Sequence, residues 1–194
     1  MDGDKACLIL GDNLFHGGDI GSSIIRAKNE IEEIGGAHLF GTAVPDPGRF
    51  GVAEISESGD IMSIDEKPEE PKSNIAVTGL YMYGSDVCER AKKLSPSKRG
   101  ELEITSVNSY YLDKSDLKVN ILGRGFAWLD TGTIDSINNA SNYIRAIEER
   151  QGLKIACLEE IAYLNKFINK SQLKELIKNL PDDYANYLRR LITN

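Results

Sequence analysis

Short apolar runs alternate with amphipathic stretches along most of the chain. Residues 7–10 are all apolar and end at Gly11, which is typical of a short strand buried on both faces of a sheet. In residues 20–34, isoleucines and an alanine recur every three or four positions, which predicts an amphipathic helix that ends at the Gly-Gly pair after it. Residues 37–44 predict another strand. Strand, helix and strand together predict a βαβ unit.

Short apolar runs and amphipathic stretches continue to alternate up to residue 152, and the pattern is different after it. Because Ser58-Gly59-Asp60 is a hairpin signal, the sheet is expected to be mixed. We expect an α/β fold with a Rossmann-like, mostly parallel mixed sheet in residues 1–152. Residues 153–194 are expected to form a helical C-terminal appendage, since the pattern is helical from residue 158 onward. Further strands are predicted at residues 51–55, 61–64, 75–83, 118–122 and 126–129, and helices at 87–94, from 101 onward and at 134–152.

Composition narrows the functional classes. The 194 residues include 30 acidic and 23 basic side chains, and the net charge of −7 argues against a general nucleic-acid surface. No apolar run approaches the length of a bilayer span and the N-terminus is unlike a signal peptide, so we expect a cytoplasmic protein with no membrane partner. The widely spaced Cys7, Cys88 and Cys157 favour reduced core residues over a disulfide framework or a zinc site.

Two aspartates follow apolar runs in matching positions. Asp12 comes after the run 7–10 and Gly11, and Asp130 ends the run 126–129. Ligands of open α/β sheets bind beyond the carboxyl ends of the strands, and Mg²⁺ prefers oxygen ligands, including substrate phosphates. The pair therefore indicates a magnesium site. A simple turn or a helix cap explains the Gly-Asp-Asn sequence as well, and this alternative stays open here.

Cations and glycines near the predicted strand ends suggest a phosphorylated ligand. Lys67 and Arg99 lie in predicted loops where a cation can neutralise a phosphate, and an arginine can bind one in a bidentate manner. Glu66 can accept hydrogen bonds from sugar hydroxyls, while Gly51 and Gly79 allow ligand atoms close to the backbone. Exposed charges, turns and bulges explain the same residues without any ligand.

Six motifs and a tail segment occur in an order that carries a family resemblance. Together they resemble the glucose-1-phosphate thymidylyltransferases over nearly the whole chain, although any single motif is a weak signal. The motifs are Leu10-Gly11-Asp12-Asn13, Arg49-Phe50-Gly51-Val52, Asp65-Glu66-Lys67-Pro68, Val77-Thr78-Gly79-Leu80-Tyr81, Arg99-Gly100-Glu101-Leu102-Glu103-Ile104-Thr105 and Ala127-Trp128-Leu129-Asp130-Thr131-Gly132-Thr133, and the tail segment is residues 154–162.

The resemblance implies a Mg²⁺-dependent enzyme, a nucleotidyltransferase that condenses dTTP with glucose 1-phosphate to give dTDP-glucose and pyrophosphate. In such a reaction the sugar phosphate oxygen attacks the α-phosphorus in line, so catalysis consists mainly of positioning and charge neutralisation. By this resemblance Asp12 and Asp130 hold Mg²⁺. Lys67 and Arg99 are the implied catalytic residues and bind the sugar phosphate.

The resemblance also implies roles for residues that the pattern alone does not single out. Gly51, Glu66 and Val77 would line the sugar pocket, and Trp128 would complete the substrate site beside the metal. The implied assembly is a homo-oligomer, a tetramer in the family, with a second, regulatory nucleotide site near a subunit interface. The candidates for that regulatory site are Gly17, Arg124 and Glu160.

The sequence departs from the family at its front. The Gly-Gly-x-Gly-Thr-Arg-Leu loop that cradles the triphosphate in the family does not occur in it. We therefore expect an N-terminally truncated chain that retains the sugar-phosphate and metal half of the fold and associates through an exposed sheet edge. The alternatives are a non-catalytic sugar-phosphate-binding or assembly protein, an inactive remnant, and a uridylyl- or adenylyltransferase for a related hexose 1-phosphate.

Overall fold

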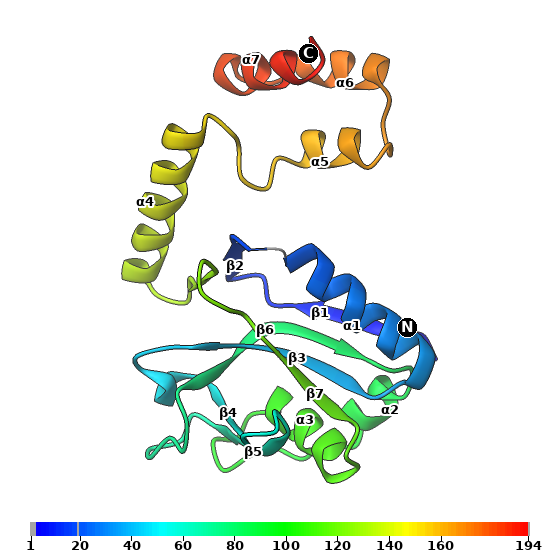
Figure 1. Ribbon diagram of the computed structural model, residues 1–194, viewed down its shortest axis with the longest axis vertical. Coiled ribbons are helices and arrows are strands. Elements are labelled where there is room, and N and C mark those ends of the chain that lie inside the picture. Colours follow the sequence, from blue (N-terminus) through cyan, green and yellow to red (C-terminus); the bar gives the residue numbers. More distant parts are fainter. Residues whose placement is uncertain (1–2, 19, 194) are drawn as a thin grey trace. The chain divides into compact units, whose positions relative to one another are not determined.

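The computed structural model describes residues 3–18 and 20–193, and the chain divides into two compact units, Met1–Gly132 and Thr133–Asn194 (Figure 1). The sequence pattern groups the helix at residues 134–152 with the α/β domain, whereas this helix belongs to the second unit. These units reflect contacts within a single chain. The predicted division into domains 1–152 and 153–194 therefore stays a prediction.

The first unit contains a six-stranded sheet in the order β5-β4-β6-β3-β7, with β1 also paired to β6. Only β3 and β7 run parallel among the described pairings, and the others are antiparallel. The expected mixed sheet is confirmed, but the expectation that it is mostly parallel is wrong for these strands. The strands of this sheet are β1 (Ala6–Ile9), β3 (Ala37–Ala43), β4 (Gly51–Ile55), β5 (Ile61–Glu66), β6 (Ile75–Tyr83) and β7 (Leu117–Ile121).

The direction of β6 explains this result. It lies between β1 and β3 and is antiparallel to both, so β1 and β3 run in the same direction without touching. The predicted βαβ unit therefore exists with a third strand inserted into it. Hydrophobic periodicity reports burial rather than strand direction, so the insertion could not be predicted from the pattern.

Both faces of the sheet are covered by helices, which confirms the α/β class. Helix α1 (Ile20–Ile34) packs on one face, and α2 (Val87–Ala91) and α3 (Ile104–Asp113) lie on the other (Figure 1). Neighbouring residues of β3 and β6 alternate between two cores, as the two-residue period of a strand requires. The α1 core includes Phe40, Leu80 and Met82, and the α3 core includes Leu39, Tyr81 and Tyr83.

Strand β1 differs from its prediction. Leu8, Ile9 and Leu10 are 39%, 56% and 40% exposed, so the run expected to be buried on both faces is largely open. Cys7 is exposed too, which corrects its interpretation as a core residue, whereas Cys157 is buried and Cys88 is half-buried. Among the described residues, none of the three cysteines forms a disulfide. The pairing of β1 with β6 uses one edge, and no pairing is described for its other edge.

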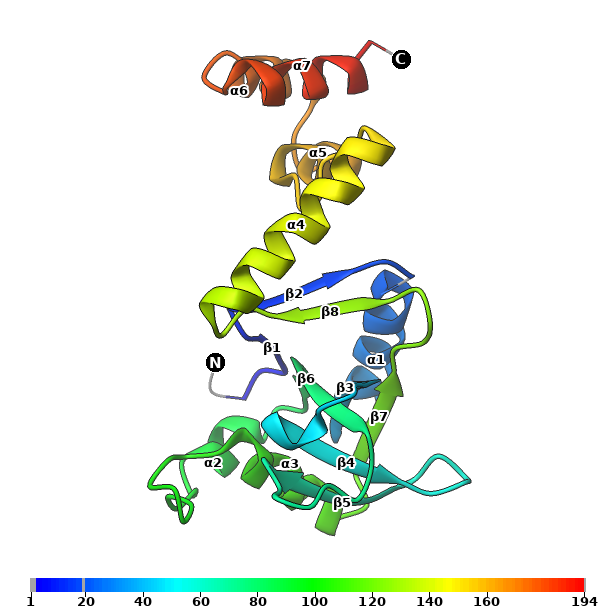
Figure 2. The same ribbon diagram turned by 90° about the vertical axis from the view of Figure 1, so that its left-hand side faces the viewer.

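A second, two-stranded sheet was missed by the sequence pattern. Strand β2 (Asn13–His16) pairs antiparallel with β8 (Ala127–Asp130), and Asn13 lies opposite Asp130 (Figure 2). The sequence Asn-Leu-Phe-His has only two apolar residues and gives too weak a strand signal. This short pairing is nevertheless what brings the two candidate magnesium motifs together.

The second unit is helical, as predicted for its later part. The N-terminus of its first helix has a capping box in which Thr133 and Ser136 bond reciprocally, and Gly152 ends that helix with a φ of 67°. A separate core is formed by Cys157, Leu173, Ile177, Ala185, Tyr187 and Leu188. Within the described residues, no helix is both long and apolar enough to span a bilayer. The helices are α4 (Ile134–Gln151), α5 (Leu158–Leu164), α6 (Lys170–Ile177) and α7 (Asp182–Leu191).

Candidate functional site

A tight turn after β1 positions Asp12. The Asn13 N–H donates to the Leu10 carbonyl at 3.1 Å, and the Leu10 N–H donates to the Gly79 carbonyl on β6 at 2.8 Å. Thr131 then binds the Asp12 carbonyl twice, through its backbone N–H and its hydroxyl, each at 2.8 Å. The turn that we kept as an alternative is therefore real, but it also fixes Asp12 beside the end of β8.

The carboxylates of Asp12 and Asp130 converge near Gly132. A Cβ atom added to Gly132 would lie 3.5 Å from Asp130 Oδ2 and 3.9 Å from Asp12 Oδ2. Partial burial and then repulsion from Asp12 raise the pKa of Asp130, while the positive charges of Arg49 and Lys67 lower it. The structure thus brings together the two aspartates that the sequence singled out.

These two carboxylates fit Mg²⁺ in their chemistry. They supply oxygen ligands, and their mutual repulsion favours a cation between them. No group of three or more His, Cys, Asp or Glu side chains suitable for a metal occurs in residues 3–18 and 20–193. A cation held here would therefore complete its shell with water or substrate phosphates, as Mg²⁺ commonly does.

Trp128 lies beside this carboxylate pair. Its indole N–H donates to Asn13 Oδ1 at 2.6 Å, and Asn13 Nδ2 donates to Asp12 Oδ1 at 2.8 Å. The ring of Phe50 packs edge-on against the indole, with the ring centroids 4.8 Å apart. Trp128 therefore lies beside the predicted metal ligands, and its role in substrate binding, like theirs in metal binding, stays a prediction.

The three residues expected to line the sugar pocket meet at the start of β4. A Cβ atom on Gly51 would lie 3.5 Å from Glu66 Oε2 and 3.8 Å from Val77 Cβ. The same Cβ would lie 3.4 Å from the hydroxyl of Thr105, which donates a hydrogen bond to Glu66. Glycine thus leaves open the space between these groups. Thr105 lies in a quoted motif, yet only its contact with Glu66 shows what it does.

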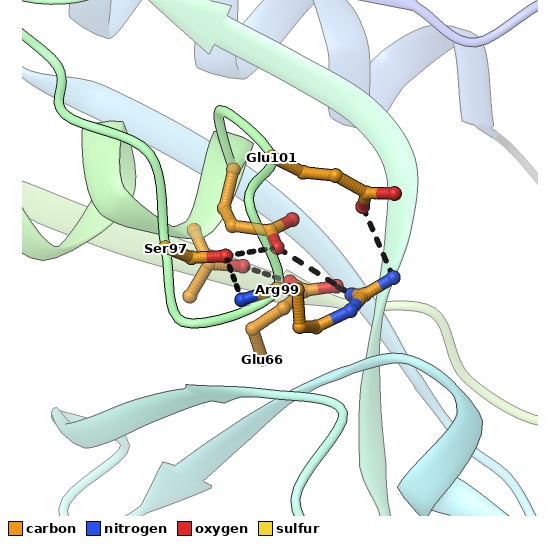
Figure 3. Close-up of polar contacts among 6 residues, drawn as sticks. Glu66, Ser97, Arg99 and Glu101 are labelled. Carbon is orange, nitrogen blue, oxygen red and sulfur yellow. Dashed lines mark hydrogen bonds and ion pairs between the residues drawn. The ribbon is translucent and has the colours of Figure 1, made fainter.

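Arg99 reaches the same cluster from the loop before α3. Figure 3 shows its guanidinium between Glu66 and Glu101, at N–O distances of 3.8 Å and 3.0 Å. Glu103 lies 3.5 Å from it and accepts a hydrogen bond from Ser97, whose hydroxyl also accepts the Arg99 backbone N–H. Three carboxylates hold this arginine at the edge of the cluster, with nearly half of its side chain exposed.

Lys67 and Arg49 supply positive charge near the carboxylates of Asp12 and Asp130. Lys67 follows β5 with a φ of 43°, an unusual conformation for a non-glycine residue, and its backbone N–H donates to the Phe50 carbonyl at 3.0 Å. The Arg49 guanidinium lies 5.4 Å from the centroid of the Phe50 ring. Both side chains act electrostatically on Asp130. Arg49 received no role from the sequence because its neighbours there, Gly48 and Phe50, give no chemical signal.

The candidate regulatory residues divide between the two units. A Cβ atom on Gly17 would lie 2.3 Å from the carbonyl oxygen of Gly125, so Gly17 packs directly against the loop that carries Arg124. Glu160 belongs to the second unit, where it accepts a hydrogen bond from the Tyr187 hydroxyl at 2.6 Å. The first two residues are therefore neighbours, and the regulatory role of all three stays a prediction.

Comparison with known proteins places this geometry in a family. The model of the nucleotidyl transferase family matches residues 1–147. The chain belongs to this family. Two curated relatives are named glucose-1-phosphate thymidylyltransferase: the Xanthomonas campestris pv. campestris protein (strain B100) is 48% identical over 192 residues, and the Neisseria meningitidis protein is 46% identical over 190 residues. These alignments cover 98% and 97% of this chain but 64% and 65% of the relatives, so the chain spans about two thirds of their length.

Solved structures share the fold of this chain. A crystal structure described as a glucose-1-phosphate thymidylyltransferase from Bacillus anthracis, in complex with a sucrose, is 42% identical with a TM-score of 0.64, over 73% of this chain and 55% of that one. UDP-glucose pyrophosphorylase complexed with UDP-glucose matches with a TM-score of 0.62, over 73% of this chain and 56% of that one. At 23% identity the second likeness concerns the fold alone. The expected Rossmann-like α/β fold is confirmed.

Proposed function

We propose that this chain provides the sugar-phosphate and metal-binding part of a glucose-1-phosphate thymidylyltransferase, which forms dTDP-glucose and pyrophosphate from dTTP and glucose 1-phosphate. The observation that carries the proposal is the joint placement of two clusters in the first unit. One is the carboxylate pair near Gly132, and the other is the group of Gly51, Glu66 and Val77 with Arg99 at its edge. The names of the relatives, at nearly half identity, favour this member of the family.

In this proposal the chain's own residues position the sugar phosphate. Glu66, held by Thr105, accepts hydrogen bonds from sugar hydroxyls in the space left open by Gly51. Arg99 and Lys67 neutralise the phosphate so that its oxygen can approach the α-phosphorus in line. No side chain needs to form a covalent bond with the substrate.

Mg²⁺ is the proposed cofactor, and Asp12 and Asp130 would hold it. Bound there, it would neutralise charge on the phosphate oxygens during transfer. The positive charges of Arg49 and Lys67 already act on Asp130, so both side chains lie close enough to the carboxylate pair to help neutralise a phosphate bound there. The cation held by the two carboxylates would thus balance the negative charge of the phosphates together with Arg49 and Lys67.

Two measurements on the purified chain test the proposal. Calorimetric titration with glucose 1-phosphate, with and without Mg²⁺, measures binding, and pyrophosphate release with dTTP measures turnover. Arg99→Met should weaken sugar-phosphate binding about tenfold or more, since a charge-assisted contact to phosphate is lost. Arg145→Met is the matched control because, in the part of the chain that the structure describes, Arg145 pairs with Glu149 alone, on the exposed surface of α4.

The outcomes separate the proposal from its alternatives. Binding with turnover supports a transferase that is active in this chain alone. Binding without turnover supports a chain that provides only the sugar-phosphate and metal-binding part, or a non-catalytic sugar-phosphate-binding protein. Turnover with UTP or ATP in place of dTTP would favour a uridylyl- or adenylyltransferase. Absence of binding would contradict all of these and leave a remnant of the fold.

The remaining parts of the proposal concern the assembly and its surroundings. We propose a cytoplasmic homo-oligomer with a regulatory nucleotide site that includes Gly17, Arg124 and Glu160. Molar mass from light scattering tests the oligomer. Inhibition by dTDP-sugars that is relieved in Arg124→Ala, without loss of glucose 1-phosphate affinity, would support the regulatory site.

A further inference from the structure

The side-chain amide of Asn13 has three hydrogen-bond partners, and they allow only one of its two orientations. Its Oδ1 accepts the backbone N–H of Gly79 at 2.9 Å and the indole N–H of Trp128 at 2.6 Å. Its Nδ2 donates to Asp12 Oδ1 at 2.8 Å. Turning the amide over would direct its NH₂ at two N–H donors and its carbonyl oxygen at a carboxylate. The two donors therefore force the NH₂ group to face Asp12.

The cradle around this amide is built to fit it. A Cβ atom on the buried Gly79 would lie 2.6 Å from Asn13 Oδ1 and 2.9 Å from its Nδ2, so a larger residue there would displace the amide. Gly79 does not have a positive φ, and space rather than backbone conformation requires the glycine. On the other side, the edge-on contact with Phe50 holds the indole that carries the second donor.

Asn13 also makes the two carboxylate oxygens of Asp12 different from each other. It binds Oδ1, while Oδ2 is the oxygen that lies near Gly132 together with the carboxylate of Asp130. A hydrogen bond to one oxygen restrains the carboxylate and favours one direction for the other oxygen. Groups that orient metal ligands in this way commonly change metal affinity when they are removed.

We propose that Asn13 is the positioning residue for the Asp12 carboxylate, and that the N–H groups of Gly79 and Trp128 hold its amide in the required orientation. This inference rests on the proposed function only in taking Asp12 as a metal ligand. It gives Trp128 a role other than donating a hydrogen bond to the sugar, because the only polar hydrogen of its side chain is committed to Asn13.

The single tryptophan of the chain provides a direct probe. In a ¹H–¹⁵N NMR spectrum its one indole N–H signal reports the bond to Asn13, and bound Mn²⁺ broadens this signal through its unpaired electrons. Titration of the wild-type chain with Mn²⁺ alone should broaden the signal at a measurable midpoint. In Asn13→Ala the signal should shift upfield, exchange faster with water and need about tenfold more Mn²⁺.

If Asn13→Ala folds poorly, Gly79→Ala and Trp128→Phe test the same role, and Gly123→Ala is the control. Gly79→Ala should also raise the Mn²⁺ midpoint, while Gly123→Ala, where a Cβ atom meets nothing within 4 Å, should not. Trp128→Phe keeps an aromatic ring against Phe50 but lacks the N–H, and free Mn²⁺ measured by electron paramagnetic resonance should show at least about threefold weaker binding.

Each outcome decides the question. Mn²⁺ midpoints within twofold of wild type in Asn13→Ala and Gly79→Ala, or a wild-type indole signal that Mn²⁺ leaves sharp, would overturn the positioning role. Asn13-dependent Mn²⁺ binding in a chain that neither binds glucose 1-phosphate nor releases pyrophosphate would instead reject the proposed function and keep this inference.

Discussion

At the residue scale, Asp130 lies in surroundings that disfavour its negative charge, which a role in binding a cation would explain. Its pKa is raised by partial burial and by the neighbouring Asp12, so its ionised form is unfavourable in the folded chain. A cation would relieve this repulsion. Groups placed for ligand binding often lower the stability of the free protein in this way.

Asp130→Asn tests this repulsion. Because the folded state raises the pKa, the folded chain binds a proton at Asp130 more tightly than the unfolded chain does, and stability lost to Asp130 is recovered as pH falls through that pKa. Without metal at pH 7 the variant should melt about 1–2 °C above wild type. This advantage should shrink toward pH 4, and added Mg²⁺ should raise the melting temperature of the wild type alone. A variant that melts below wild type at pH 7 would show that the repulsion is unimportant.

Thr105 provides a second test at this scale. Its buried hydroxyl donates to Glu66, so Thr105→Val keeps the shape of the side chain but removes the donor. We expect affinity for glucose 1-phosphate to fall about three- to tenfold by calorimetry, since the Glu66 carboxylate is no longer held. Thr105→Ser restores the hydroxyl and should bind nearly as the wild type does. Equal loss in both variants would point to packing rather than the hydrogen bond.

The sequence predicted the site residues that have a strong local signal. Asp12 and Asp130 follow apolar runs, and the structure brings them together. Arg49, Asn13 and Thr105 were given no role because each acquires its partner from a distant part of the chain. The bond between Asn13 and Trp128, for example, joins residues 115 positions apart. Contacts of this kind leave no periodicity in a sequence.

At the element scale, the lengths and types of elements were easier to predict than their surroundings. Strand β6 extends over Ile75–Tyr83, as its apolar run predicts, because both of its faces are buried. Strand β1 has the same apolar character, yet most of it is exposed. Apolar composition predicts a strand but not what covers it. The strand thus combines an apolar surface with an edge for which no pairing is described, and such edges favour association.

Ile9→Lys tests the consequence of this edge. Ile9 is 56% exposed, so a lysine there can reach water and removes little packing, and charged residues are a common means of blocking edge pairing. Light scattering over a concentration series should show less association for the variant, with a melting temperature within about 2 °C of wild type. Glu57→Gln, at an exposed residue of the β4–β5 hairpin, raises the net charge by the same one unit and is the control for charge. A wild-type chain that stays monomeric throughout would contradict the expected association.

At the scale of the whole molecule, the chain has separate cores in its two units. The two cores of the sheet lie wholly within Met1–Gly132, and the helical core lies wholly within Thr133–Asn194. The sequence predicted an α/β part followed by helices because the period changes from two to 3.6 along the chain. Helix α4 has an ordinary amphipathic pattern that suits either unit, so the predicted domain boundary at residue 152 stays a prediction.

Separate cores predict separate unfolding. Leu188 is fully buried in the helical core, and Leu188→Ala should destabilise that unit by about 2–5 kcal/mol through lost contacts and a cavity. Trp128 is in the first unit, so its fluorescence should melt as in wild type while part of the helical circular dichroism melts earlier. Leu39→Ala, at an equally buried position of the sheet, should lower the melting temperature reported by Trp128 instead. If both signals shift together in either variant, the two units unfold as one, and metal binding at Asp12 and Asp130 would then depend on the helical unit as well.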